Sequence, residues 1–133
     1  MGYGGPIEID GLKLYSNWGG ASFTARAAAR VVRLMLREGN WEGRPLISAA
    51  AVRATTSDAG TPGQCGIGWW SARENENRAV PRDAYYALGA QEQIAMGIPS
   101  RNVIVIRNGG TLGGSSSASF FPPLMQALDA RKP

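Results

Sequence analysis

Hydrophobic residues recur with two different spacings along this chain. Between Thr24 and Gly39 they follow a helical period, which predicts an amphipathic helix with one buried face. Thr24 is a suitable N-cap, and Gly39 follows the last turn as a C-terminal stop. The positions expected on the buried face are Ala28, Val31, Val32, Met35 and Leu36.

The second spacing lies further along the chain. Two short apolar runs, Ile94–Ile98 and Val103–Ile106, flank the turn-forming segment 99–102, which predicts two antiparallel strands. The polar residues 91–93 precede the first run and follow Leu88-Gly89-Ala90. The first strand is therefore either part of an ordinary hairpin with a polar face, or the border of a site where a ligand needs bare backbone.

Weaker patterns complete the prediction. Ser48 is expected to cap a short helix over 49–55, and 66–70 to form a strand before an exposed polar loop over 71–83. Further segments are a strand at 7–9 or 12–15 and a C-terminal helix over 120–132, with Pro123 at an early helical position.

The expected fold class is α+β: one domain, 1–133, with an antiparallel sheet of about three strands and flanking helices. Three strands are few for a stable sheet, so we expect one edge or face to need a partner. Composition agrees with a globular protein, because 44% of the 133 residues are hydrophobic and only 18% are charged. The 18 glycines favour a loop-rich α+β protein over a helical bundle.

The net charge of +4 permits an anionic partner without indicating one. A stripe of Arg26, Arg30, Arg33 and Arg37 on the polar side of the first helix could bind phosphates. No aromatic residue interleaves with it, so a solvated helix face is the favoured interpretation, and no nucleic-acid partner is expected. No apolar run is long enough to span a membrane, so we expect no membrane partner.

The residues that are missing restrict the chemistry. The single Cys65 excludes an internal disulfide and any cysteine-cluster metal site, and its small apolar neighbours favour a buried inert thiol. Without histidine, the chain cannot form a Ser-His or Cys-His pair or a histidine zinc site. We therefore expect neither a metal nor an organic cofactor.

Several blocks resemble the C-terminal part of the serine β-lactamase-like family, which includes class C β-lactamases, penicillin-binding-protein-like peptidases and related esterases. They are NWGGASFTARAAARVVRLMLREGNWEGRPLIS, GIGWW, PRDAYYALGAQEQ, IPSRNVIVIRNGG and FFPPLMQAL. Their order and spacing follow the family over roughly residues 7–130. The resemblance implies an incomplete part of a β-lactamase/transpeptidase-like fold that hydrolyses or transfers an acyl group of an amide, ester or β-lactam.

The resemblance also implies a site. In the family a Ser-x-x-Lys serine attacks an acyl group, and a Lys-Thr-Gly or His-x-Gly motif lines the cleft. Ala87, Leu88 and Gly89 occupy the positions of that motif, so Gly89 would let substrate approach the backbone. The N–H of Ala90 would match the second oxyanion donor. Gln91 and Glu92 would narrow or repolarise the cleft. The alternative is a plain hairpin with a glycine-permitted bulge.

The chain departs from the family in one decisive respect, because it contains no Ser-x-x-Lys. Its lysines are Lys13 and Lys132, and neither follows a serine by three residues. Tyr15-Ser16-Asn17 looks like the family's Tyr-x-Asn motif, but it runs straight into the Arg-rich helix, which favours a structural loop. We therefore expect the nucleophile, lysine and tyrosine to precede Met1.

Alone, the chain is expected to be inactive, as a truncated, split or degenerate hydrolase. The partners expected are the missing N-terminal part or a second copy that pairs through an exposed sheet edge. A small acyl substrate would bind only to the completed enzyme. The alternative function is a non-catalytic module that self-associates or binds a partner through that edge.

Overall fold

The computed structural model describes residues 7–14, 23–57, 65–73, 79–110 and 117–131. It is an α+β protein built on a four-stranded antiparallel sheet with the order β5-β6-β7-β8, one strand more than expected. The α+β prediction is therefore confirmed. The strands are β5 (Trp70–Ser71), β6 (Tyr85–Gly89), β7 (Gln93–Ile98) and β8 (Val103–Arg107).

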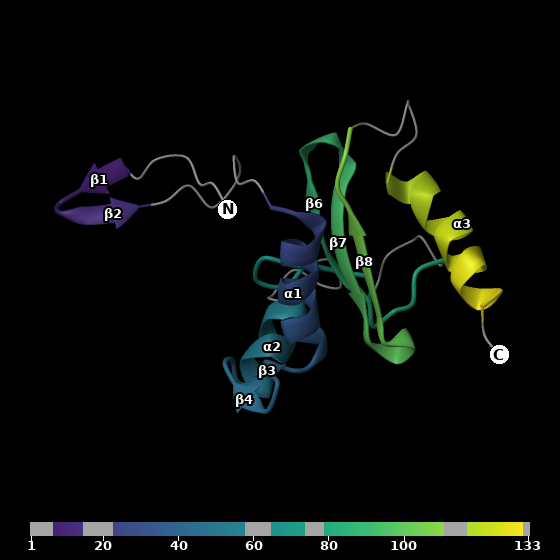
Figure 1. Ribbon diagram of the computed structural model, residues 1–133, viewed down its shortest axis with the longest axis horizontal. Coiled ribbons are helices and arrows are strands. Elements are labelled where there is room, and N and C mark those ends of the chain that lie inside the picture. Colours follow the sequence, from purple (N-terminus) through teal and green to yellow (C-terminus); the bar gives the residue numbers. More distant parts are fainter. Residues whose placement is uncertain (1–6, 15–22, 58–64, 74–78, 111–116, 132–133) are drawn as a thin grey trace.

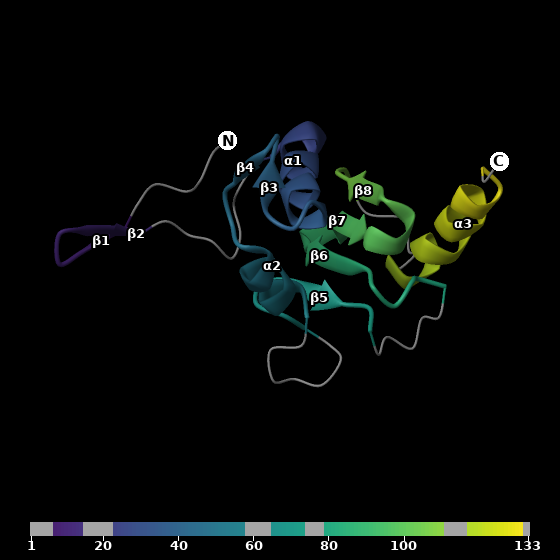
Figure 2. The ribbon, with the colours of Figure 1, turned by 90° about the horizontal axis from the view of Figure 1, so that it is seen from below.

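Helices cover both faces of this sheet (Figures 1 and 2). The helices α1 (Ala25–Leu36) and α2 (Ala49–Thr56) lie on one side, and α3 (Ser117–Asp129) lies on the other. Strands that have helices against both faces need apolar residues on both faces, which explains the continuous apolar runs in β7 and β8.

The first two helices begin where their capping residues predict. The Thr24 side chain accepts a hydrogen bond from the amide of Ala27, and Ser48 accepts one from Ala51. Gly39 ends the helical region with φ +83°, and a Cβ there would lie 2.0 Å from the carbonyl oxygen of Ile47. Glycine is therefore required at that position both by conformation and by space.

Two hydrophobic clusters lie on the two sides of β7. Toward α3, alternate residues of β7 are completely buried, together with Phe121 and Met125 of the helix. These β7 residues are Ile94, Met96 and Ile98. Toward α1, Val32 and Met35 pack with Val52 of α2 and Tyr85 of β6. Because side chains alternate along each strand, each face of the sheet contributes to a separate hydrophobic core.

Tyr85 connects the sheet to α1 across a glycine. Its register partner on β7 is Gly97, and a Cβ at Gly97 would lie 2.4 Å from the Tyr85 hydroxyl oxygen. The ring therefore lies where a side chain of β7 would otherwise stand. Its hydroxyl donates a hydrogen bond to the carbonyl oxygen of Val32, at 3.3 Å, and its edge meets Trp69 with 5.2 Å between ring centroids. Burial raises the pKa of the Tyr85 phenol above its ordinary value, so the group stays protonated.

Several elements differ from the sequence expectation. Residues 7–9 and 12–14 both form strands, β1 (Ile7–Ile9) and β2 (Leu12–Leu14), which pair as a hairpin. A second small hairpin, β3 (Asn40–Trp41) with β4 (Arg44–Pro45), occupies what was expected to be a turn. The strand expected at 66–70 is shifted, because β5 contains only Trp70 and Ser71.

The helical surfaces also need correction. Val31 was expected on the buried face of α1 but is 51% exposed, because the helix turns Val32 and Met35 toward the sheet. The helix α3 begins at Ser117, before the expected start, so Pro122 and Pro123 lie inside it rather than at its first positions. Burial of Phe121 and Met125 holds that helix against the sheet despite the two missing N–H donors.

The contact between Tyr85 and Gly97 leads to a stability prediction. The variant Gly97→Ala is expected to lose about 1–3 kcal/mol of unfolding free energy, because the added methyl group forces the buried ring out of place. Urea unfolding measures the change. The matched control is Gly110→Ala, where a Cβ meets nothing within 4 Å and a change within about 0.5 kcal/mol is expected. Equal stability of the two variants would contradict this packing.

Candidate functional site

The residues predicted to line a cleft lie at one end of the β6–β7 hairpin. Ala87, Leu88 and Gly89 are the last three residues of β6, and the final pair of the ladder is Gly89 with Gln93. The sequence predicted that the first strand of the hairpin would run on from Leu88 through residues 91–93. This prediction is wrong, because residues 90–92 form a short 3₁₀ turn. Ala90 therefore lies one residue beyond the ladder, and it is exposed at the tip.

The outer edge of β6 is only partly covered. The neighbouring strand β5 pairs with Tyr85 and Tyr86 and goes no further. Along Ala87–Gly89 no described residue forms a strand partner on that side, and the Leu88 side chain is 42% exposed. Within the described part of the chain, this end of β6 thus has no strand neighbour on the β5 side, next to the turn that carries Ala90.

A local packing constraint also explains why a glycine occupies position 89. Its backbone is extended, with φ −123° and ψ 168°, so the conformation does not require glycine. A Cβ at this position would lie 3.1 Å from Cβ of Gln93, the residue opposite it. The missing side chain relieves this crowding at the end of the hairpin, whichever function the edge has.

The turn itself holds two consecutive residues in the left-handed region. Gln91 has φ +57° and Glu92 has φ +62°, which non-glycine residues rarely adopt. Arg107 of β8 holds both in place: its Nη1 donates to the carbonyl oxygens of Gln91, at 3.3 Å, and Glu92, at 2.9 Å. Its Nη2 donates to the carbonyl oxygen of Gly110, at 2.6 Å. One guanidinium therefore fastens the turn to the segment after β8.

Gln93 makes a second connection between the same two segments. Its Oε1 accepts a hydrogen bond from the amide of Gly109, at 3.1 Å, and its Nε2 donates to the Gly109 carbonyl oxygen. The sequence prediction assigned no role to Arg107 or Gln93. The contacts that join the two segments are to backbone groups 15 or 16 residues away, for which no local motif gives a signal.

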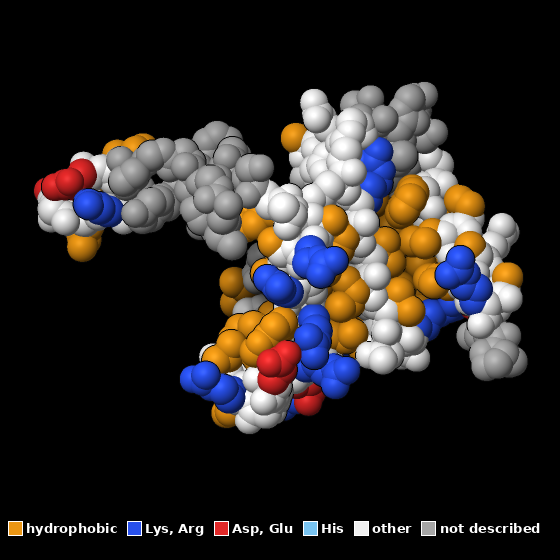
Figure 3. All heavy atoms as spheres, viewed as in Figure 1, with side chains coloured by type: hydrophobic (Ala, Val, Ile, Leu, Met, Phe, Trp, Pro, Cys, Tyr) orange, Lys and Arg blue, Asp and Glu red, His pale blue; other side chains and the backbone are white. Residues whose placement is uncertain are grey.

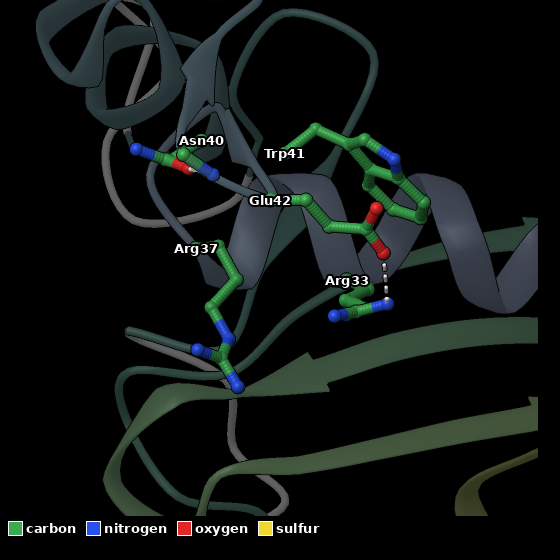
Figure 4. Close-up of a pocket in the computed structure, with 6 residues that line it drawn as sticks. Arg33, Arg37, Asn40, Trp41 and Glu42 are labelled. Atoms are coloured by element: carbon green, nitrogen blue, oxygen red, sulfur yellow. Dashed lines mark hydrogen bonds and ion pairs between the residues drawn. The ribbon is translucent and has the colours of Figure 1, made fainter.

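A separate polar hollow of about 250 Å³ lies at the C-terminal end of α1 (Figure 4). Arg33 lies over the Trp41 ring, 4.9 Å from its centroid, and forms a 3.8 Å ion pair with Glu42. The Asn40 Oδ1 accepts a hydrogen bond from the amide of Gly43. Most polar groups in this hollow already contact each other, and the carboxyl end of a helix disfavours an anion. We assign no site there.

The remaining candidates have simple placements. All four arginines of the α1 stripe are exposed, as expected for a solvated helix face. Cys65 is half-buried rather than buried, and its backbone pairs with that of Trp70 in an isolated antiparallel β-bridge. Tyr15, Ser16 and Asn17 lie outside the described residues, as does Lys132.

Two searches for other kinds of site are negative within the described ranges. No group of three His, Cys, Asp or Glu side chains there is placed to hold a metal ion. Of the helices that the structure describes, none has the length and apolar character needed to cross a bilayer.

Comparisons with models of protein families, with curated proteins and with solved structures find no match for this chain. The resemblance to the serine β-lactamase-like family thus depends on the sequence blocks alone.

The Arg107 contacts predict a measurable effect on the turn. In Arg107→Met the two left-handed residues lose their charge-assisted hydrogen bonds, each of which contributes about 1.5–3 kcal/mol. We expect faster amide hydrogen exchange over residues 90–93, with little change in the buried half of β7. Exposed Arg26 offers the control Arg26→Met, which should leave exchange unchanged. Identical exchange in both variants would show that the clamp does not hold the turn.

Proposed function

We propose that this chain is the C-terminal part of a β-lactamase-related serine hydrolase, an incomplete part of a β-lactamase/transpeptidase-like fold. In it β6 forms one wall of the cleft, and the nucleophile belongs to other polypeptide. The observation that carries the proposal is the open edge of β6 at Ala87–Gly89, which leads directly to the exposed Ala90. The resemblance of the sequence blocks suggests the type of reaction, and the edge of β6 is where an acyl substrate would bind.

In this proposal the chain contributes through its backbone. A serine hydroxyl on the other polypeptide attacks the substrate carbonyl, and a base there takes its proton. The oxygen of the tetrahedral intermediate then accepts a hydrogen bond from the N–H of Ala90. Collapse of the intermediate expels the leaving group, which is protonated by the same base. Water or an acceptor nucleophile then attacks the acyl-enzyme, takes the acyl group and restores the serine hydroxyl.

The contacts of Arg107 and Gln93 fit such a role. An oxyanion donor stabilises charge only where its position is fixed before the reaction. The turn that begins at Ala90 is held by Arg107 from β8, and Gln93, the β7 residue after the turn, accepts a hydrogen bond from the amide of Gly109. Ala87, Leu88 and Gly89 would bind the substrate along the edge, and Gln91 and Glu92 would narrow or repolarise the cleft.

The second candidate function is association through a sheet edge, without catalysis. The observation that favours it is β8, an apolar strand at the margin of the sheet. The two functions use opposite margins, because β6 opens on the β5 side and β8 on the other.

The absence of Ser-x-x-Lys predicts that the isolated chain does not form an acyl-enzyme. After incubation with a fluorophosphonate or a fluorescent penicillin, the intact mass of the 133-residue chain is expected to stay unchanged. A stoichiometric adduct on any serine would refute the prediction. In the coding sequence upstream of Met1, an in-frame Ser-x-x-Lys followed by Tyr-x-Asn is expected, and its absence would remove the hydrolase proposal.

The backbone donor gives a prediction for the completed enzyme. Ala90→Pro removes the N–H while fitting the local backbone, because proline suits the first position of a helical turn and Gly89 is extended. The rate of acyl transfer is expected to fall by about 10²–10³. Ala90→Ser keeps the N–H and should retain most of the activity. A fully active proline variant with an unchanged melting temperature would show that Ala90 donates nothing to the reaction.

A further inference from the structure

The strand β8 has the composition of an interior strand but lies at the margin of the sheet. Val103 and Val105 pack toward the α3 cluster, and Ile104 and Ile106 pack toward the α1 cluster. Both faces are thus apolar and covered by helices. On its outer side β8 has no strand partner among the residues that the structure describes. Figure 3 looks onto this margin and shows hydrophobic side chains between β8 and α3.

The margin lacks the features that normally protect an edge strand. Between residues 103 and 106 there is no proline, no charge and no bulge. The charges at its two ends are already engaged: Arg101 pairs with Asp129 of α3 at 2.6 Å, and Arg107 donates to backbone carbonyls. Nothing in this row of residues repels an additional apolar strand.

The same chain carries a strand pair with an uncovered apolar face. In the β1–β2 hairpin Ile9 pairs with Leu12, and Glu8 pairs with Lys13, so aliphatic and charged residues lie on opposite faces. Ile7, Ile9 and Leu12 are 67%, 54% and 67% exposed. The hairpin stands apart from the sheet and helices in both views (Figures 1 and 2). An isolated two-stranded hairpin is marginally stable in water, so this one needs a surface to cover it.

We propose that the β1–β2 hairpin of one copy adds to the β8 edge of a second copy and extends its sheet. Main-chain hydrogen bonds would then satisfy the outer side of β8. The aliphatic face of the hairpin turns toward α3, where Phe120, Leu124 and Leu128 are only partly buried. Glu8 and Lys13 then lie on the opposite face of the hairpin, away from α3.

The exchange is reciprocal in this proposal. Stable interfaces bury about 1,200 Å² or more in total, and one hairpin with two three-residue strands is small against that area. Two copies that each donate a hairpin double the contact and close the assembly as a dimer. The inference deepens the second candidate function and leaves the β6 margin free, so it can be tested separately from the hydrolase proposal.

The test compares two double variants of the full chain by sedimentation over a range of concentrations. Ile9→Thr with Leu12→Thr removes the aliphatic face but keeps residues that favour strands. Glu8→Thr with Lys13→Thr makes the same number of changes on the opposite face. The wild type is expected to dimerise. The first variant should raise the dissociation constant at least about tenfold, and the second should stay within about threefold.

Hydrogen exchange gives a second readout at the acceptor strand. The amides of Val103–Arg107 that point away from β7 are expected to be protected in the dimer and to lose that protection in Ile9→Thr with Leu12→Thr, while the amides that bond between β7 and β8 stay protected. A monomeric wild type would overturn both the inference and the second candidate function. A dimer that both variants leave intact would overturn the hairpin contact alone, and neither result bears on the fluorophosphonate test.

Discussion

The structure depends on the burial of β7 between two helical layers. Ile94, Met96 and Ile98 are almost entirely removed from water on the α3 side, while Gly97 leaves room for the Tyr85 ring on the α1 side. That ring fills the space and reaches the backbone of α1 through its hydroxyl. Large side chains toward α3 thus alternate along β7 with the small residues Ala95 and Gly97 toward α1, which lets the sheet pack against helices on both faces. The hairpin tip and both margins of the sheet are positioned by this central strand.

Sequence reasoning succeeded where the structure is determined by neighbours in the chain. Thr24 and Ser48 cap their helices, and the two apolar runs around residues 99–102 pair as β7 and β8. It was less accurate for elements that depend on distant contacts. β5 is short because it pairs with only two residues of β6, and α3 includes two prolines because its aromatic and methionine side chains are buried against the sheet. Neither cause is visible in a local window.

The candidate site shows the same division. Leu88, Gly89 and Ala90 were expected at the start of a strand, whereas Gly89 is the last residue of β6 and Ala90 begins a turn. The conformation of the next two residues was not predictable, because Gln91 and Glu92 adopt left-handed backbone angles that their residue types disfavour. Arg107, sixteen residues after Gln91, stabilises that conformation by binding carbonyl oxygens. A contact of this kind requires the sheet to be formed first, so the turn follows from the fold rather than from its own sequence.

The order of strands separates two uses of the same sheet. In the proposals above, an extended substrate would lie along β6 beside Ala90, and a strand would be added to β8 at the opposite margin. The two margins are nevertheless linked, because Arg107 belongs to β8 and binds the turn next to Ala90. Addition of a strand to β8 would restrain Arg107 through the backbone that carries it, and would thereby hold the turn more firmly. In the two proposals, association at the β8 edge would thus act on the placement of the proposed donor Ala90 through the guanidinium of Arg107.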